Sequence, residues 1–160
     1  MTADSSARPV LLVVHHTSSP ATQELLAAAL TGTRADGLEG VTVNVVPALA
    51  ANATDVLAAD GFLLGTPANI GYMSGALKVF FDTVYYPTLI AKPGAPYGLY
   101  VHGNNDTAGA VRAAESIAKG MGWRRVSEPV TVIGAPSKTD RDAVAELAAT
   151  VAAHVVGLLS

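Results

Sequence analysis

The sequence has no cysteine, little charge and no long apolar run. Without cysteine, disulfides and cysteine-based metal or redox sites are excluded. Charged residues make up 14% of the 160 residues, the net charge is −3, and no basic block is present. A nucleic-acid-binding surface is therefore not expected. The longest apolar runs, residues 10–14 and 155–159, are far shorter than the roughly 20 residues that a membrane span needs.

What is present favours one folded domain. Half of the residues are hydrophobic, which is too many for a disordered chain, and the length fits a single domain. Residues 1–8 lack the charged and apolar regions of a signal peptide and are predicted to be a disordered lead-in to a domain of residues 9–160. The expected location is the cytoplasm.

Buried β-strand patterns alternate with helical patterns along the whole chain. Continuous apolar runs predict strands that are covered on both faces, and apolar residues at helical spacing predict amphipathic helices between them. Such alternation is typical of a doubly wound α/β fold with a parallel sheet. The predicted strands are residues 10–14, 41–46, 61–64, 97–101 and 130–133, and the predicted helices are residues 20–30, 54–59, 73–84, 110–121 and a last one after Thr139 whose inner face extends to Leu158.

Polar residues gather where predicted strands end, which is where ligands bind in open α/β sheets. The loop after the first strand holds four hydroxyl residues just before a helix, namely Thr17, Ser18, Ser19 and Thr22. Hydroxyls and free N–H groups at a helix start favour a phosphate. Ordinary N-capping would need only one of these hydroxyls.

Two further loops are predicted to lie beside this one. Residues 65–75 contain Gly71, which allows the backbone to approach a planar ligand closely, and Asn69, which offers an amide. Residues 102–109 contain two glycines and two asparagines. We expect Ser74 to cap the helix after the second loop, and Asp106 or Thr107 to cap the helix after the third.

Several common site motifs are absent. The sequence contains neither G-x-G-x-x-G nor G-x-x-x-x-G-K-[ST], which disfavours a dinucleotide Rossmann domain and a P-loop NTPase. Ser74 does not lie in the G-x-S-x-G elbow of a hydrolase. No acidic residue occurs in residues 15–22 or 65–75, so a receiver domain is a poor fit. The adjacent His15 and His16 would point to opposite faces of a strand, so no metal site is expected.

These motifs resemble those of the flavodoxin-like superfamily, best its NAD(P)H-dependent FMN reductase and quinone-oxidoreductase branch. Residues 17–22 are similar to the phosphate loop S/T-x-T/S-G-N-T, and residues 65–75 are similar to G-[ST]-P-x-x-x-G-x-M-S-G, followed here by F-x-D at residues 80–82. The resemblance covers most of residues 9–159. It implies a three-layer sandwich with a five-stranded parallel sheet in the order 2-1-3-4-5.

The resemblance also implies an FMN site built from the three loops. The implied cofactor-binding residues are His16, Thr17, Ser18, Ser19, Ala21, Thr22, Thr66, Pro67, Ala68, Asn69, Ile70, Gly71, His102, Gly103, Asn104 and Asn105. No catalytic side chain is implied, because the flavin carries the chemistry. Pro20 stands where the family often has Gly and removes one phosphate-facing N–H, so we expect weakened FMN affinity. Asn69 stands where the branch often carries Arg, which leaves the preference between NADH and NADPH open.

The predicted function is an FMN-dependent oxidoreductase that takes hydride from NADH or NADPH and reduces a small-molecule electron acceptor such as a quinone or a free flavin. Two alternatives stay open, namely an electron-shuttling flavodoxin and a degenerate flavodoxin-like protein with weak FMN binding. A net charge of −3 gives little electrostatic steering to a protein partner, which ranks the shuttle lower. A homodimer and a homotetramer are both compatible with the sequence.

Overall fold

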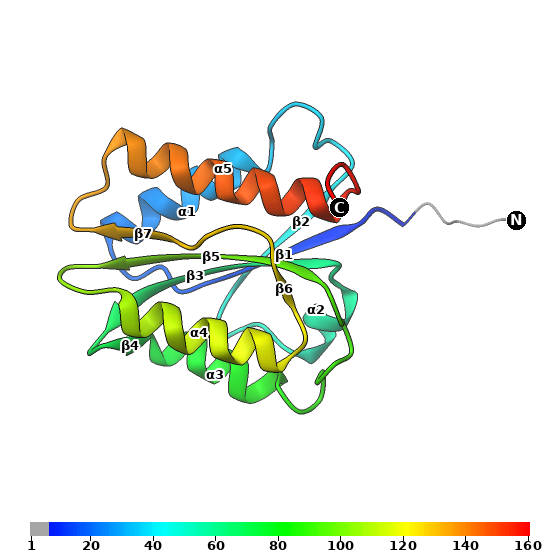
Figure 1. Ribbon diagram of the computed structural model, residues 1–160, viewed down its shortest axis with the longest axis horizontal. Coiled ribbons are helices and arrows are strands. Elements are labelled where there is room, and N and C mark those ends of the chain that lie inside the picture. Colours follow the sequence, from blue (N-terminus) through cyan, green and yellow to red (C-terminus); the bar gives the residue numbers. More distant parts are fainter. Residues whose placement is uncertain (1–6) are drawn as a thin grey trace, which may run out of the picture.

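A mainly parallel β-sheet lies between two layers of helices (Figure 1). The computed structural model describes residues 7–160, so the first six residues of the predicted lead-in 1–8 lie outside the described residues. Within the lead-in, Arg8 donates hydrogen bonds to the carbonyls of Glu39 and Gly40. The strands are β1 (Val10–His15), β2 (Thr42–Pro47), β3 (Gly61–Asn69), β4 (Tyr72–Met73), β5 (Pro96–Gly103), β6 (Arg124–Arg125) and β7 (Val130–Ile133).

The strand order confirms the predicted arrangement. The central path is β2-β1-β3-β5, and β6 and β7 both pair with β5 along its outer side, so that together they form the fifth position of the sheet. Among the strands of residues 7–160, only β4 is antiparallel, and it pairs with the end of β3. The carboxyl ends of the four long parallel strands, β2, β1, β3 and β5, therefore meet at one edge of the sheet.

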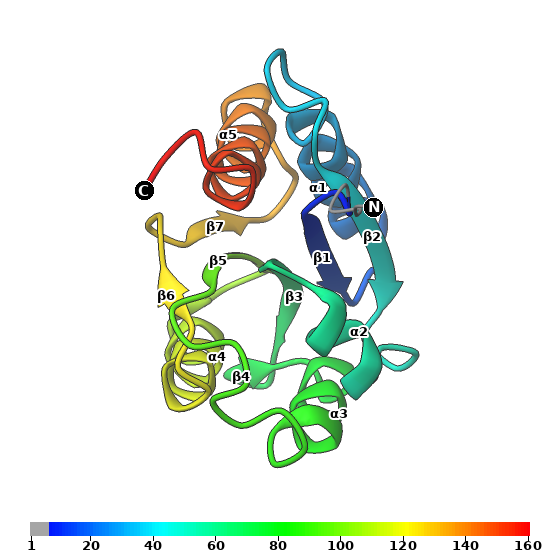
Figure 2. The same ribbon diagram turned by 90° about the vertical axis from the view of Figure 1, so that its right-hand side faces the viewer.

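Helices cover both faces of this sheet. Figure 2 shows α1 and α5 on one side, and α2, α3 and α4 on the other. Their bounds are α1 (Pro20–Gly32), α2 (Ala53–Ala58), α3 (Gly75–Val84), α4 (Ala108–Gly120) and α5 (Lys138–Val155). Among residues 7–160, none of these helices is long and apolar enough to cross a membrane.

The two helical layers explain the unbroken apolar runs of the strands. In β1, Leu11 and Val13 pack with α1 and α5, whereas Leu12 and Val14 pack with α2, α3 and α4. All four side chains are fully buried. Burying a Leu or Val side chain contributes roughly 1.5–3 kcal/mol, so successive residues of one strand stabilise both layers.

Three local predictions from the sequence are wrong. β3 continues to Asn69, five residues beyond the predicted end of the third strand, because its end pairs with β4. Met73 belongs to β4, and α3 begins only at Gly75. Leu158 is exposed and lies beyond the end of α5, because the helix stops at Val155 before Gly157 adopts a positive φ.

Candidate functional site

A cleft of about 320 Å³ opens at the carboxyl ends of the parallel strands. Four loops contribute to it, those that follow β1, β3, β5 and β7. This is where the strand order reverses around β1 and β3, the place where open α/β sheets bind ligands. The lining residues are Ser18, Ser19, Pro20, Ala21, Pro67, Ala68, Asn69, His102, Gly103, Asn104, Gly134 and Ala135.

The loop after β1 is held together by the Thr22 hydroxyl. Ser19 caps α1, and its side chain accepts a hydrogen bond from the Thr22 N–H at 3.1 Å. In return, Thr22 Oγ1 accepts from the N–H groups of Ser18 at 3.0 Å and Ser19 at 2.9 Å. Thr22 is only 2% exposed, so its hydroxyl shapes the loop from beneath and does not line the cleft.

The donors left for a ligand in this loop are few and neutral. Pro20 has no N–H, and the hydrogen bonds of residues 7–160 include none from the Ala21 N–H, which belongs to the first turn of α1. Such first-turn N–H groups, together with the positive end of the helix dipole, favour an anion. The exposed Ser18 hydroxyl adds a further donor beside it.

The two histidines at the end of β1 lie beside this loop. His15 Nδ1 and the Thr17 hydroxyl are 2.8 Å apart and hydrogen-bonded. Partial burial, with a smaller effect of His16, lowers the pKa of His15, so that its imidazole is neutral at pH 7. The His16 N–H donates to the carbonyl of Gly65. The buried Nδ1 of His16 has no hydrogen-bond partner among residues 7–160.

The loop after β3 is a tight hairpin. Ala68 pairs with Met73 and Asn69 with Tyr72, which leaves Ile70 and Gly71 as a two-residue turn. Both have positive φ angles, 50° and 72°, as the favoured turn of such hairpins requires. Glycine adopts this conformation freely, whereas a β-branched residue does so only under strain. The Ile70 side chain is fully exposed at the tip of the hairpin.

Thr66 and Ser74 fix the base of this hairpin. The buried Thr66 hydroxyl donates to the carbonyl of Pro67 at 2.8 Å and accepts from the Ser74 N–H at 3.1 Å. The Ser74 hydroxyl in turn accepts from the Leu77 N–H, which confirms the predicted cap of α3. Thr66 thus braces the hairpin from within.

The loop after β5 approaches the hairpin closely. A Cβ atom on Gly103 would lie 3.0 Å from the carbonyl oxygen of Asp106 and 3.5 Å from the Ala68 side chain. At Gly109, in the first turn of α4, a Cβ atom would lie only 1.9 Å from the carbonyl oxygen of Gly71. Two glycines therefore let the third loop and α4 pack against the hairpin. The expected cap of α4 is supplied by Asp106, whose carboxylate accepts from the Ala108 N–H, while Thr107 makes no side-chain cap.

The fourth loop was missed by the sequence analysis. Gly134 and Ala135 line the cleft directly after β7. The Gly134 N–H donates to the carbonyl of Gly103, and its carbonyl accepts from His102 Nε2 at 2.8 Å. His102, 8% exposed, thereby joins the third and fourth loops. The signal was available, because Gly134 follows the predicted strand 130–133 directly.

The structure places the sixteen predicted residues in three kinds of position. Nine of them line the cleft, namely Ser18, Ser19, Ala21, Pro67, Ala68, Asn69, His102, Gly103 and Asn104. Thr22 and Thr66 are buried braces beneath it. His16 and Thr17 at the end of β1, Ile70 and Gly71 at the hairpin tip, and the exposed Asn105 lie outside its lining.

The chemistry of the cleft is uncharged. Its lining holds no Lys, Arg, Asp or Glu, and it offers hydroxyls, side-chain amides and backbone groups. Within residues 7–160, no three His, Asp or Glu side chains gather as a metal site would require. A phosphate fits the N-terminal end of α1. Pro67, Ala68, Asn69, Gly103 and Asn104 add an apolar and amide-bearing lining that suits a flat ring system. The donor set therefore suits FMN.

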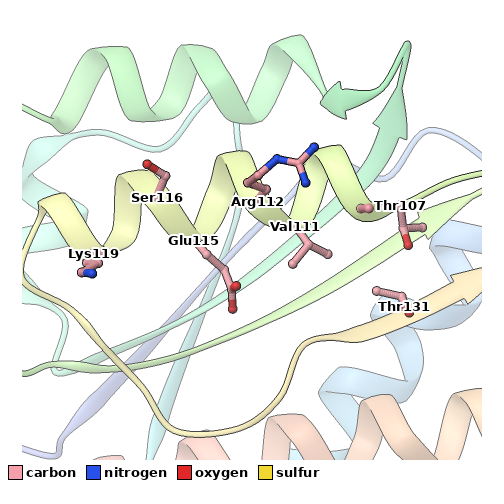
Figure 3. A pocket seen from close by; sticks show the side chains of 8 residues that line it. Thr107, Val111, Arg112, Glu115, Ser116, Lys119 and Thr131 are labelled. Atoms are coloured by element: carbon pink, nitrogen blue, oxygen red, sulfur yellow. The ribbon is translucent and has the colours of Figure 1, made fainter.

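A second and larger hollow, of about 680 Å³, lies along the outer side of α4 next to β7 (Figure 3). Unlike the cleft, it contains charged side chains. Its lining residues are Thr107, Ala108, Val111, Arg112, Glu115, Ser116, Lys119 and Thr131. We call it the α4 groove.

The sheet order and the position of the cleft define a flavodoxin-like α/β protein. Solved structures agree with this class. A flavodoxin from the domain Archaea superposes with a TM-score of 0.75 at 19% identity, covering 91% of this chain and 98% of that one. A WrbA-like flavodoxin from Agrobacterium tumefaciens superposes with a TM-score of 0.73 at 18% identity. The superposition covers 93% of this chain and 98% of that one. At such identities the similarity shows the fold.

The sequence family of the chain follows from a match to a family model. Residues 38–138, more than half of the chain, match the family described as NADPH-dependent FMN reductase. The chain belongs to this family. Membership confirms the predicted class, a flavodoxin-like FMN flavoprotein of the oxidoreductase type. The match begins after the phosphate loop, so the residues around Pro20 are not part of it.

A curated relative is also similar over part of its length. A flavodoxin from Aquifex aeolicus (strain VF5) is 36% identical over 74 residues, which are 46% of this chain. This chain spans only 39% of that relative's length.

Proposed function

We propose that the protein binds FMN in the cleft and catalyses the transfer of reducing equivalents from NADH or NADPH to a small acceptor such as a quinone or a free flavin. The observation that carries this proposal is the uncharged cleft, which joins the N-terminus of α1 to the β3–β4 hairpin and the loop after β5. Family membership supports the cofactor and the reaction class.

In this proposal the phosphate of FMN lies at the start of α1. The Ala21 N–H and the hydroxyls of Ser18 and Ser19 would donate to its oxygens. Because His15 is neutral, it adds no positive charge beside the phosphate. The positive end of the α1 dipole is then the main electrostatic attraction for the phosphate. Thr22 acts indirectly, because it holds the N–H groups of Ser18 and Ser19.

The ring system would lie between the hairpin and the loop after β5. Pro67, Ala68 and Asn69 form one wall, and Gly103 and Asn104 form the other. The Asn side chains and the backbone of these loops can hydrogen-bond the polar edges of the ring, and Ile70 can cover it at the hairpin tip. When bound, FMN supplies hydride and electron transfer, so the protein contributes position and electrostatics.

A direct test combines binding with turnover. Protein stripped of flavin should quench FMN fluorescence on binding, and the FMN-loaded protein should oxidise NADH or NADPH in the presence of a quinone. Anaerobic titration with each nicotinamide then identifies the donor. No uptake of FMN at saturating concentration would refute the proposal.

The electron-shuttling alternative rests on the similarity to a flavodoxin. It predicts stable FMN binding but no turnover with either nicotinamide. The same titration therefore separates the two functions. The degenerate alternative is supported by Pro20 and by the internal bonding of the Ser18 and Ser19 N–H groups, and it predicts weak FMN binding only.

A further inference from the structure

The proposed cleft lacks any cation that could hold the phosphates of a pyridine dinucleotide. Its lining contains no Lys or Arg. A dinucleotide whose nicotinamide reaches the flavin carries two negative charges on its pyrophosphate, and NADPH carries a further phosphate on its adenosine ribose. Charge-assisted bonds from Arg or Lys are the usual way to hold such groups. Cations that could bind them therefore lie outside the cleft, on a neighbouring surface.

The α4 groove begins where the cleft ends. The loop after β5 lines the cleft with Gly103 and Asn104 and runs directly into Thr107, which lines the groove. In the next turn, Gly109 packs against the carbonyl of Gly71 at the hairpin tip. A molecule that leaves the cleft over the third loop thus arrives at the first turn of α4.

The groove carries cations that are free for a ligand. Arg112 and Lys119 line it and form no ion pair within residues 7–160. Glu115, the acid in the groove, accepts from Arg125 at 2.9 Å, and Arg125 also bonds Glu128 at 3.0 Å. The lining of the groove thus holds two cations, Arg112 and Lys119, and one acid, Glu115, whose charge is paired with Arg125. The lining therefore carries a net positive charge.

Arg112 is directed toward the cleft end of the groove. Figure 3 shows its side chain extending along α4 toward the N-terminal end of the helix, on the side of β4. It lies three residues after Gly109, so both occupy the same face of α4. Lys119 lies seven residues farther along, about 10 Å down the helix axis, and can contact a separate phosphate.

Size and charge together favour a nucleotide. A volume of about 680 Å³ is within the range of small-molecule sites. The groove also offers hydroxyls from Ser116 and Thr131 for ribose or phosphate oxygens. We propose that the α4 groove binds the adenosine-side phosphates of the pyridine dinucleotide, with Arg112 as the specificity-determining contact. This inference rests on the proposed function of the cleft.

The test uses a fragment that contains only the proposed ligand portion. Adenosine 2′,5′-bisphosphate is titrated into FMN-loaded protein labelled with ¹⁵N. Amide shifts are expected at Thr107–Lys119 and at Thr131. Arg112→Ala should weaken fragment binding at least tenfold and raise the KM for the dinucleotide by a similar factor, with kcat unchanged. FMN affinity should stay the same, because Arg112 does not line the cleft.

Arg124→Ala is the matched control, since Arg124 is an exposed arginine four residues after the end of α4 that does not line the groove. It should change fragment affinity less than twofold. An equal loss in both variants would mean general electrostatic attraction and would overturn the proposal. Amide shifts confined to the cleft would also overturn the proposal. The same holds if inorganic phosphate binds as tightly as the bisphosphate.

The two proposals fail in different ways. If FMN does not bind, the function of the cleft is wrong, and the groove is tested by the fragment on the flavin-free protein. If FMN binds and NADH or NADPH is oxidised, but Arg112→Ala behaves like the unsubstituted protein, only the groove assignment is wrong.

Discussion

At the scale of single residues, the most consequential side chain is one that does not face the cleft. The Thr22 hydroxyl accepts from two backbone N–H groups and is almost completely buried. Ser19 and Thr22 also form a reciprocal capping box at the start of α1. One hydroxyl thus sets both the helix start and the shape of the proposed phosphate loop.

Replacing Thr22 by Val keeps the shape of the side chain and removes these bonds. The N–H groups of Ser18 and Ser19 would then lose their acceptor, which costs about 1–3 kcal/mol of unfolding free energy. We also expect FMN affinity to fall at least tenfold. Urea unfolding and fluorescence quenching measure the two effects. Thr54→Val, at an exposed threonine in the first turn of α2, should change neither, and unaltered FMN affinity in Thr22→Val would contradict the assigned role.

His154 makes folding sensitive to acid. Burial, with a smaller effect of Arg124, lowers the pKa of His154 below 6.5, and its Nδ1 has no hydrogen-bond partner in residues 7–160. As the pH falls through 6.5, the unfolded chain takes up this proton before the folded protein does. The free energy of unfolding should therefore decrease until the pH reaches the pKa of the folded state.

His154→Gln should remove this contribution and flatten the pH dependence. Urea unfolding at pH 7.5, 6.5 and 5.5 measures it as the difference between the variant and the unsubstituted protein. His15, whose pKa is also lowered, is unchanged in both proteins and cancels in that difference. Parallel curves for the two proteins would show that His154 does not titrate differently on folding.

At the scale of elements, the contact between α4 and the β3–β4 hairpin positions one wall of the cleft. It depends on Gly109, where a Cβ atom would collide with the backbone of Gly71. Because backbone cannot rotate away as a side chain can, Gly109→Ala must displace the hairpin or the helix. We expect a loss of about 1–3 kcal/mol in stability and several-fold weaker FMN binding.

Gly75→Ala is the control for this prediction. Gly75 opens α3, and a Cβ atom there would meet nothing within 4 Å. Ala favours a helix over Gly, so this variant should be unchanged or more stable by up to about 1 kcal/mol, with normal FMN binding. If Gly109→Ala behaves in the same way, the contact does not hold the hairpin in place.

The elements differ in how far the sequence predicts them. β1 follows from its apolar run, because burial on both faces leaves no other pattern. β7 was predicted in the same way, yet only Val132 of its four residues is buried. The hairpin does not follow, since Ile70 is a residue that local preferences exclude from a positive φ. Its conformation depends on pairing between β3 and β4 and on the contact with α4. Likewise, the bond from His102 to Gly134 joins residues 32 positions apart, so it is visible only in the fold.

At the scale of the whole molecule, the charge distribution separates two tasks. The uncharged cleft is suited to a phosphate held by neutral donors, and the basic α4 groove is suited to a more highly charged ligand. The cleft lies at the carboxyl ends of the strands, and the α4 groove runs from the first turn of α4 to Lys119 in its last turn. The two sites therefore begin at the same edge of the sheet, and the groove leads away from it along the helix.

This arrangement predicts that FMN stabilises the entire protein and that its phosphate is responsible for much of the effect. A ligand at 100 times its Kd stabilises the folded state by about 2.7 kcal/mol. For a chain of this length that corresponds to a rise in Tm of roughly 5–10 °C. Riboflavin has the same ring but no phosphate, so at equal concentration it should raise Tm by much less. Differential scanning calorimetry with both compounds measures this, and equal shifts would show that the start of α1 does not hold the phosphate.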